Sequence, residues 1–117
     1  MQVENAIAFV TEHEKTAFEI RVNFGVFAGR DATSAELENL GKLLVPEAGA
    51  ASIVAEERHE MSDGVEVVLH QVRVAVPQDH MPTEQGERKA VCDRLVGLCE
   101  IWARRCIHER HADITEL

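Results

Sequence analysis

One glutamate and two histidines have the residue types and the spacing best suited to acid–base chemistry. They are Glu57, His59 and His70. The dipeptide Asp63-Gly64 lies between the first two and the third, and it is a strong signal for a two-residue β-hairpin turn. Such a turn places Glu57 opposite His70 and puts all three side chains on one face. A carboxylate beside a histidine orients the ring and favours its charged form, so the group can serve acid–base catalysis or bind a metal ion. The alternative is an exposed, wet end of the sheet.

A second group of potential metal ligands lies near the C-terminus. His108 and His111 are three residues apart, so they share a helix face, and Cys106 precedes them. Cys106, however, falls about 200° around a helix from His108. The spacing also differs by one residue from the His-Glu-x-x-His pattern of zinc proteases. A solvated helix end is the simpler interpretation, and we expect no metal or other cofactor.

Three cysteines recur every seven residues, at Cys92, Cys99 and Cys106. On one helix, neighbours in this series are about 10.5 Å apart along the axis, which is too far for a disulfide. We therefore expect reduced thiols that serve as small apolar residues in a buried stripe.

Composition argues against several classes of function. The formal net charge is −9, with 12 basic and 21 acidic residues, which opposes binding to nucleic acid. Only 4% of the residues are aromatic, so stacking on single strands is also not expected. No apolar run approaches the ~20 residues of a membrane span, and the N-terminus lacks the positive charge of a signal peptide. The sequence predicts a cytoplasmic protein without a membrane or nucleic-acid partner.

The elements that position these residues can be read from the patterning. Apolar residues alternate with polar ones over 17–28, which predicts a strand. Thr33 and Glu36 have the spacing of a capping box, so a helix begins there, and Pro46 and Gly49 are expected to end it.

The remaining elements are two hairpin runs, a long helix and an ambiguous N-terminus. The second hairpin run, 65–76, is apolar on both faces, which is typical of a central strand. Thr83 is expected to cap a helix that continues to about Arg110. Val3, Ile7 and Val10 suit one face of a short helix, whereas residues 5–11 suit an edge strand, and we favour the strand.

These elements predict one α+β domain over residues 1–117. We expect an antiparallel sheet of three or four strands, with two main helices on one face and a long C-terminal helix. The order of strand, helix and hairpin suggests the split βαβ arrangement of ferredoxin-like folds. That architecture hosts many unrelated activities, so it implies none.

The leading functional hypothesis is a non-catalytic interaction or assembly module. The chain would act as a homodimer or as a small subunit of a complex with another protein. Its predicted interface is the open face of the sheet at Val65, Val67 and Leu69, with Trp102 as a second contact. The alternative is a small-molecule-binding or enzymatic domain that uses the sheet face around the two hairpin histidines.

Overall fold

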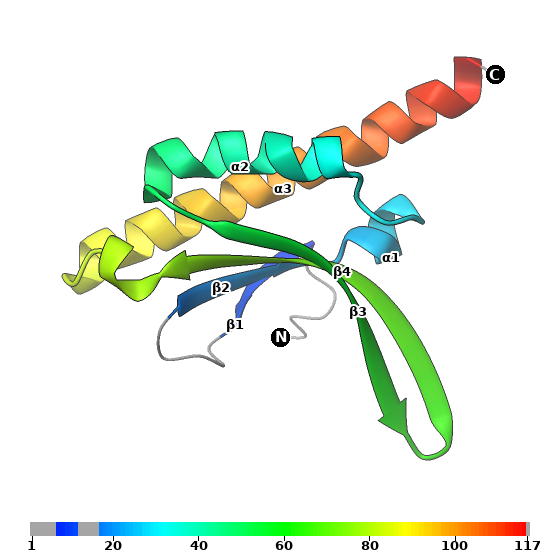
Figure 1. Ribbon diagram of the computed structural model, residues 1–117, viewed down its shortest axis with the longest axis horizontal. Helices are drawn as coiled ribbons and strands as arrows, with labels where there is room; N and C mark the ends of the chain where they lie inside the picture. The colour runs from blue at the N-terminus through cyan, green and yellow to red at the C-terminus, as the bar shows by residue number, and fades with distance from the viewer. Residues whose placement is uncertain (1–6, 12–16, 117) are drawn as a thin grey trace.

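In the computed structural model, which describes residues 7–11 and 17–116, the chain forms a four-stranded antiparallel sheet with helices packed on one face (Figure 1). The strand order is β1-β2-β4-β3. The strands are β1 (Ala8–Thr11), β2 (Ala17–Val22), β3 (Ser52–Ser62) and β4 (Val65–Pro77). The helices are α1 (Phe24–Ala28), α2 (Ser34–Ala48) and α3 (Gln85–Glu116), with a 3₁₀ turn, η2, at Gln78–His80. In α3 the side chains are described as far as His108.

The hairpin of β3 and β4 has the predicted turn and register. Asp63 and Gly64 both have positive φ, at 52° and 77°, as a two-residue hairpin turn requires. Glu57 consequently lies opposite His70, as expected. β4 pairs with β3 on one side and with β2 on the other, so the strand with two apolar faces is central. Both predictions are confirmed.

The N-terminal segment contributes an edge strand, which was the favoured interpretation. β1 pairs antiparallel with β2, and Ala8 lies opposite Val22. The rest of this prediction, residues 5–6 and the connection over 13–16, lies outside the described residues.

The strand predicted over 17–28 is too long, because β2 ends at Val22 and a short helix follows. Asn23 leaves the extended conformation at φ −78° and ψ 62°, and its side-chain oxygen accepts a 2.7 Å hydrogen bond from Gln71 Nε2. Phe24 and Ala28 are then both buried because they are four residues apart on one helix face. Five apolar residues are too few for periodicity to separate a strand from a helix.

α2 begins with the predicted capping box. The Thr33 hydroxyl accepts from the Glu36 backbone N–H at 3.2 Å, and the Glu36 carboxylate accepts from the Thr33 N–H at 2.9 Å. The helix does not stop at Pro46 but continues to Ala48, and Gly49 ends it with φ 83°. Pro46 lies in the last turn, so the hydrogen bond that it cannot donate to the carbonyl of Lys42 is lost only near the end of the helix.

α3 begins one residue later than a helix capped by Thr83 would, and it ends beyond Arg110. The Glu84 carboxylate, rather than Thr83, accepts the free N–H groups of Gly86 and Glu87 at 2.9 and 2.7 Å. These bonds lower the Glu84 pKa. No helix in the part of the chain that the structure describes is long and apolar enough to cross a membrane.

The core lies between the helices and one face of the sheet. Leu40 and Leu44 from α2 and Leu95 from α3 are completely buried against the sheet. The strand residues of this cluster alternate, as one-sided burial demands. They are Phe18, Ile20, Val22, Val72, Val74 and Val76.

The far half of the hairpin projects from this core as a two-stranded arm. β2 pairs with β4 only from Val72 onward, so residues 56–71 extend past the sheet without a third strand. Figure 1 shows this segment, the hairpin arm, pointing away from the helices. Its valines are exposed, at 61% for Val65, 48% for Val67 and 42% for Val68.

The contact of α1 with β4 requires a glycine at position 25. A Cβ added to Gly25 would lie 2.7 Å from His70 Cβ, whereas one added to Gly97, in α3, would meet nothing within 4 Å. We therefore expect Gly25→Ala to lower the free energy of unfolding by about 1–3 kcal/mol. Gly97→Ala should raise it by up to about 1 kcal/mol, as glycine removal does inside a helix. Urea unfolding measures both, and a Gly25→Ala protein as stable as the parent would contradict this packing.

Candidate functional site

The hairpin histidines belong to a chain of alternating carboxylates and imidazoles. Glu57 lies between them, with its carboxylate oxygens 3.8 Å from His59 Nε2 and 3.9 Å from His70 Nε2. His59 Nδ1 is hydrogen-bonded to Glu66 at 2.6 Å. His70 Nδ1 lies 2.7 Å from Asp31 Oδ1, a close contact that is not aligned as a hydrogen bond. The structure thus brings together the three predicted residues and adds two carboxylates.

Only one of the two added carboxylates could have been predicted from the sequence. Glu66 is on the same face of β4 as His70, so strand alternation alone could have included it. Asp31 reaches the group from the loop between α1 and α2. No local pattern connects it to His70.

This chain is open to solvent, which limits its chemistry. Between 35 and 65% of each of the five side chains is exposed. Water at this exposure screens the ion pairs and leaves no dry cavity in which a substrate could be held. No group of three or more His, Cys, Asp or Glu side chains is arranged to hold a metal ion within the described residues.

The predicted C-terminal ligands do not form a site. Cys106 is buried at 4% exposure, whereas His108 is exposed. The side chain of His111 lies outside the described residues. Cys99 is also buried, and burial raises its pKa to about 12, so it stays a neutral thiol. Cys92 is partly exposed, and all three cysteines are free.

Trp102, the predicted second interface contact, is instead part of the core. It is 3% exposed, and its ring lies 5.3 Å from that of Phe24. Its indole Nε1 donates a 2.8 Å hydrogen bond to the backbone oxygen of Glu36. The ring is therefore held in place by contacts within the chain.

The open face of the sheet carries a paired ionic network where β2, β4 and β3 lie side by side. Arg21 binds Glu56 at 2.6 Å, and Arg73 binds Glu19 at 3.2 Å. Arg21 also contacts the amide oxygen of Gln71 at 3.4 Å. These charged residues occupy the middle of the face. Apart from Val54, the large exposed apolar side chains of β3 and β4 on this face lie on the hairpin arm.

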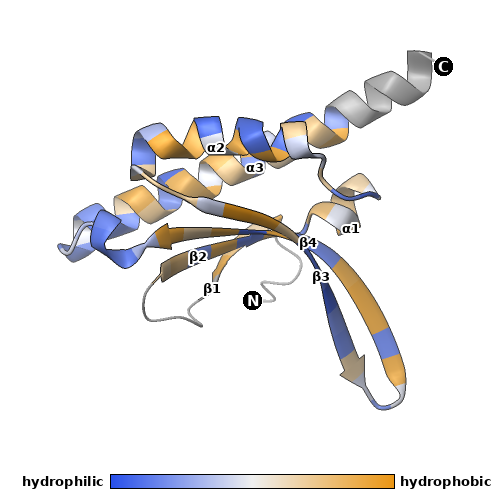
Figure 2. Cartoon of the chain, viewed as in Figure 1, coloured by the Kyte–Doolittle hydropathy of each residue, from blue (hydrophilic) through white to orange (hydrophobic). Residues whose placement is uncertain are grey.

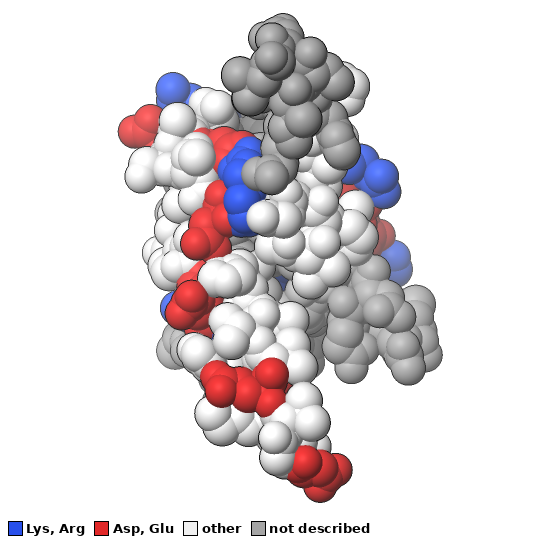
Figure 3. Space-filling view, turned by 90° about the vertical axis from the view of Figure 1, so that its right-hand side faces the viewer, with Lys and Arg blue, Asp and Glu red and all other residues white. Residues whose placement is uncertain are grey.

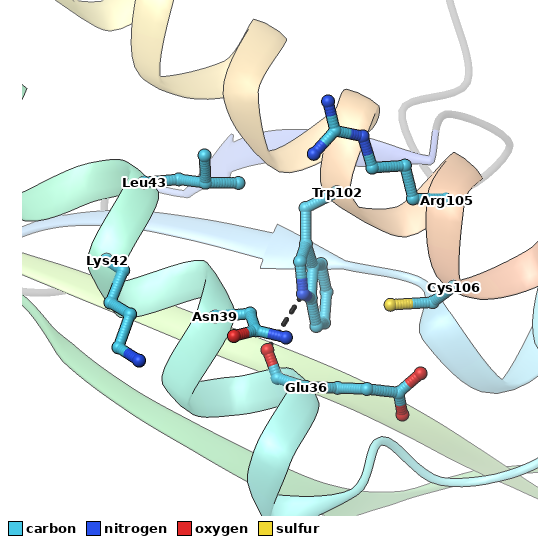
Figure 4. Close-up of a pocket in the computed structure, with 7 residues that line it drawn as sticks. All are labelled: Glu36, Asn39, Lys42, Leu43, Trp102, Arg105 and Cys106. Carbon is cyan, nitrogen blue, oxygen red and sulfur yellow. Dashed lines mark hydrogen bonds between the residues drawn. The ribbon is translucent and has the colours of Figure 1, made fainter. Parts of the chain in front are cut away.

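A hollow of about 280 Å³ lies between α2 and α3, and sequence reasoning did not identify it (Figure 4). Residues at helical spacing on α2 mark the face that lines it, but the sequence does not show that this face meets Trp102. The lining consists of Glu36, Asn39, Lys42, Leu43, Trp102, Arg105 and Cys106.

The acidic group of this hollow is already neutralised. Arg30 donates two parallel hydrogen bonds to the Glu36 carboxylate, at 2.7 and 2.8 Å. The hydrogen bonds from this guanidinium, together with those from the Thr33 backbone and the Cys106 thiol, lower the Glu36 pKa to about 2 against the opposing effect of burial. Glu36 is therefore a permanent anion with a fixed partner.

Comparison of the chain with protein-family models found no match, and neither did comparison with curated proteins or with solved structures. The function is therefore inferred from the chain's own geometry.

Glu36→Gln should make the free energy of unfolding depend less on pH in the acid range. Because folding lowers the Glu36 pKa from 4.5 to about 2, its ion pair stabilises the fold above pH 4.5 and is lost as the pH falls through about 2. Glutamine preserves the capping box, so we expect a loss of about 1–2 kcal/mol at pH 7, allowing for solvent screening. This deficit should shrink below pH 4.5 and vanish near pH 2.

Urea unfolding across this pH range measures the difference. Glu38→Gln is the control, since Glu38 is an exposed residue of the same helix, and we expect a change below about 0.5 kcal/mol. A Glu36→Gln deficit that is equal at pH 7 and near pH 2 would contradict the role of the ion pair.

Proposed function

We propose that the protein is a non-catalytic assembly module that forms a homodimer through its hairpin arm. The observation that carries this proposal is the row of apolar side chains beside an unpaired edge of β4. Val65, Val67 and Leu69 alternate along the face of the arm that points away from the helices. Figure 2 shows the apolar bands along β4 in the arm. A two-stranded ribbon is marginally stable in water by itself, so a partner that covers this row would stabilise it.

The edge of β4 favours a second strand as the partner. Over residues 65–69 no described strand pairs with β4 on the side opposite β3. Unpaired N–H and C=O groups in a regular strand form a template for another strand. α1 lies against His70 at the inner end of this edge and sets the limit of the available backbone.

The sequence of this edge is self-complementary, which supports a second copy of the chain as the partner. Antiparallel pairing of β4 with its copy about a twofold axis at Val67 places Val65 opposite Leu69 of the partner subunit. The same match recurs on the other side of the axis, so the apolar row continues across both strands. The outer strand of each arm then flanks the row with charges of both signs, as Arg58 and Glu60 show at 2.6 Å.

We also propose that the fold is a variant of the split βαβ, ferredoxin-like arrangement. β2 and β3 are both antiparallel to β4 and lie on either side of it, which supports this assignment. β1 occupies the outer edge beside β2. The arrangement by itself indicates no activity.

The chain of carboxylates and imidazoles favours a second candidate function, a small-molecule-binding or enzymatic domain. His59 and His70 each have one ring nitrogen beside a carboxylate and the other facing Glu57. This arrangement orients both rings for proton transfer. It ranks second because the whole group is exposed to water.

Val67→Glu should convert the dimer to a folded monomer. The substitution places a charge at the proposed twofold axis, where it would meet its own copy. Light scattering after size exclusion should give twice the 13.0 kDa chain mass for the parent protein and 13.0 kDa for the variant. The circular dichroism spectrum should stay the same.

Val45→Glu is the matched control, because Val45 is 45% exposed and lies on α2, away from the arm. It should remain a dimer. A parent protein that is monomeric at tens of micromolar, or a Val45→Glu protein that dissociates as readily as Val67→Glu, would overturn the proposal.

A further inference from the structure

The hollow between α2 and α3 has a rigid floor. Trp102 is held from both sides, by the hydrogen bond of its Nε1 to the Glu36 carbonyl and by its contact with Phe24. Leu43 adds an apolar wall from α2. The hollow therefore has a preformed apolar surface, which small-molecule sites typically have. It lies on the helical layer, apart from the hairpin arm.

The polar groups around this floor are not used by the chain itself. Among the basic side chains that the structure describes, only Lys42, Arg104 and Arg105 make no hydrogen bond or ion pair. Two of these, Lys42 and Arg105, line the hollow from opposite helices. Figure 4 shows Arg105 on the α3 side of the Trp102 ring and Lys42 with Asn39 on the α2 side.

The charge of the hollow is positive, in contrast to the protein as a whole. The Glu36 carboxylate is neutralised by Arg30, so no acidic group of the lining remains to balance Lys42 and Arg105. The net charge of −9 acts at long range, but salt screens it beyond about 8 Å at physiological ionic strength. The two local cations therefore determine which charge the hollow attracts.

We infer that this hollow binds a small organic carboxylate with an apolar body. The Arg105 guanidinium suits a carboxylate because it can donate two parallel hydrogen bonds, and Lys42 adds a second positive charge. The apolar body would lie against Trp102 and Leu43. The volume of about 280 Å³ limits the ligand to a small molecule. The Cys106 thiol is engaged with Glu36, so we expect reversible binding and no covalent step.

The single tryptophan makes this inference directly testable. Trp102 is the chain's one tryptophan and tyrosine is absent, so tryptophan emission and the indole N–H resonance both report on the floor of the hollow. Cyclohexanecarboxylate is a suitable probe because it does not absorb where tryptophan is excited. We expect it to shift both signals saturably with a dissociation constant of about 1 mM or below. Neutral cyclohexanemethanol and inorganic phosphate should each bind at least about tenfold more weakly.

Two neighbouring arginines provide the matched variants. Arg105→Ala should weaken binding of the probe by about tenfold or more, through loss of the charge-assisted bonds. Arg104→Ala removes an equal charge from an exposed and unpaired side chain that does not line the hollow, and it should bind like the parent. Thermal melts check that both variants fold.

Three results would overturn the inference. The first is the absence of a saturable shift in either signal at about 10 mM probe. The second is an equal loss of affinity in the two arginine variants, which would indicate general charge attraction. The third is phosphate binding as tightly as the carboxylate, which would indicate a bare anion site instead of one for an organic acid.

Discussion

The burial of one face of β4 beneath α2 and α3 is the interaction on which the rest of the structure depends. Val72, Val74 and Val76 are at most 1% exposed, and they join both neighbouring strands to both long helices. β4 has 13 residues, but β2 pairs with only six of them, and the helices cover the same half. The other half must leave the core. The projecting hairpin arm is thus a direct consequence of the difference in length between β4 and its inner neighbour.

The two faces of the sheet differ in polarity. The face beneath the helices is apolar, whereas the opposite face pairs Arg21 and Arg73 with Glu19 and Glu56. Removing one member of such a partly buried network would leave a charge without a partner, which makes the network a unit. It also keeps the centre of the face from attracting apolar surface. On the projecting arm, at the bottom of Figure 3, acidic groups lie among uncharged atoms. Assembly and ligand binding are therefore proposed at separate places, the arm and the hollow between the helices.

The difference in solvent exposure between the two candidate sites decides which of them carries the ligand hypothesis. The histidines of the arm have well-placed carboxylate partners, but their side chains are largely exposed to solvent. The hollow between α2 and α3 combines a fixed aromatic floor with two unpaired cations. A binding site needs this combination of preformed shape and unused polar groups, because ordering and desolvation otherwise cancel the gain in contact energy. For this reason the hollow carries the ligand hypothesis, although the arm has the residues more often found in catalysis.

The sequence by itself determined the capping box at Thr33, the hairpin turn and the pairing of Glu57 with His70. Local patterns of residues were sufficient for these three features. Each depends on hydrogen bonds or alternation between residues that are near in the chain or linked by a tight turn. The helix after Val22, the approach of Asp31 to His70 and the position of Trp102 over the Glu36 carbonyl were decided only by the tertiary structure. The bond from Trp102 to Glu36 spans 66 residues, and no periodicity encodes which faces of two helices will meet. Packing selects those faces, because the apolar stripes of α2 and α3 must both be buried against one side of β4.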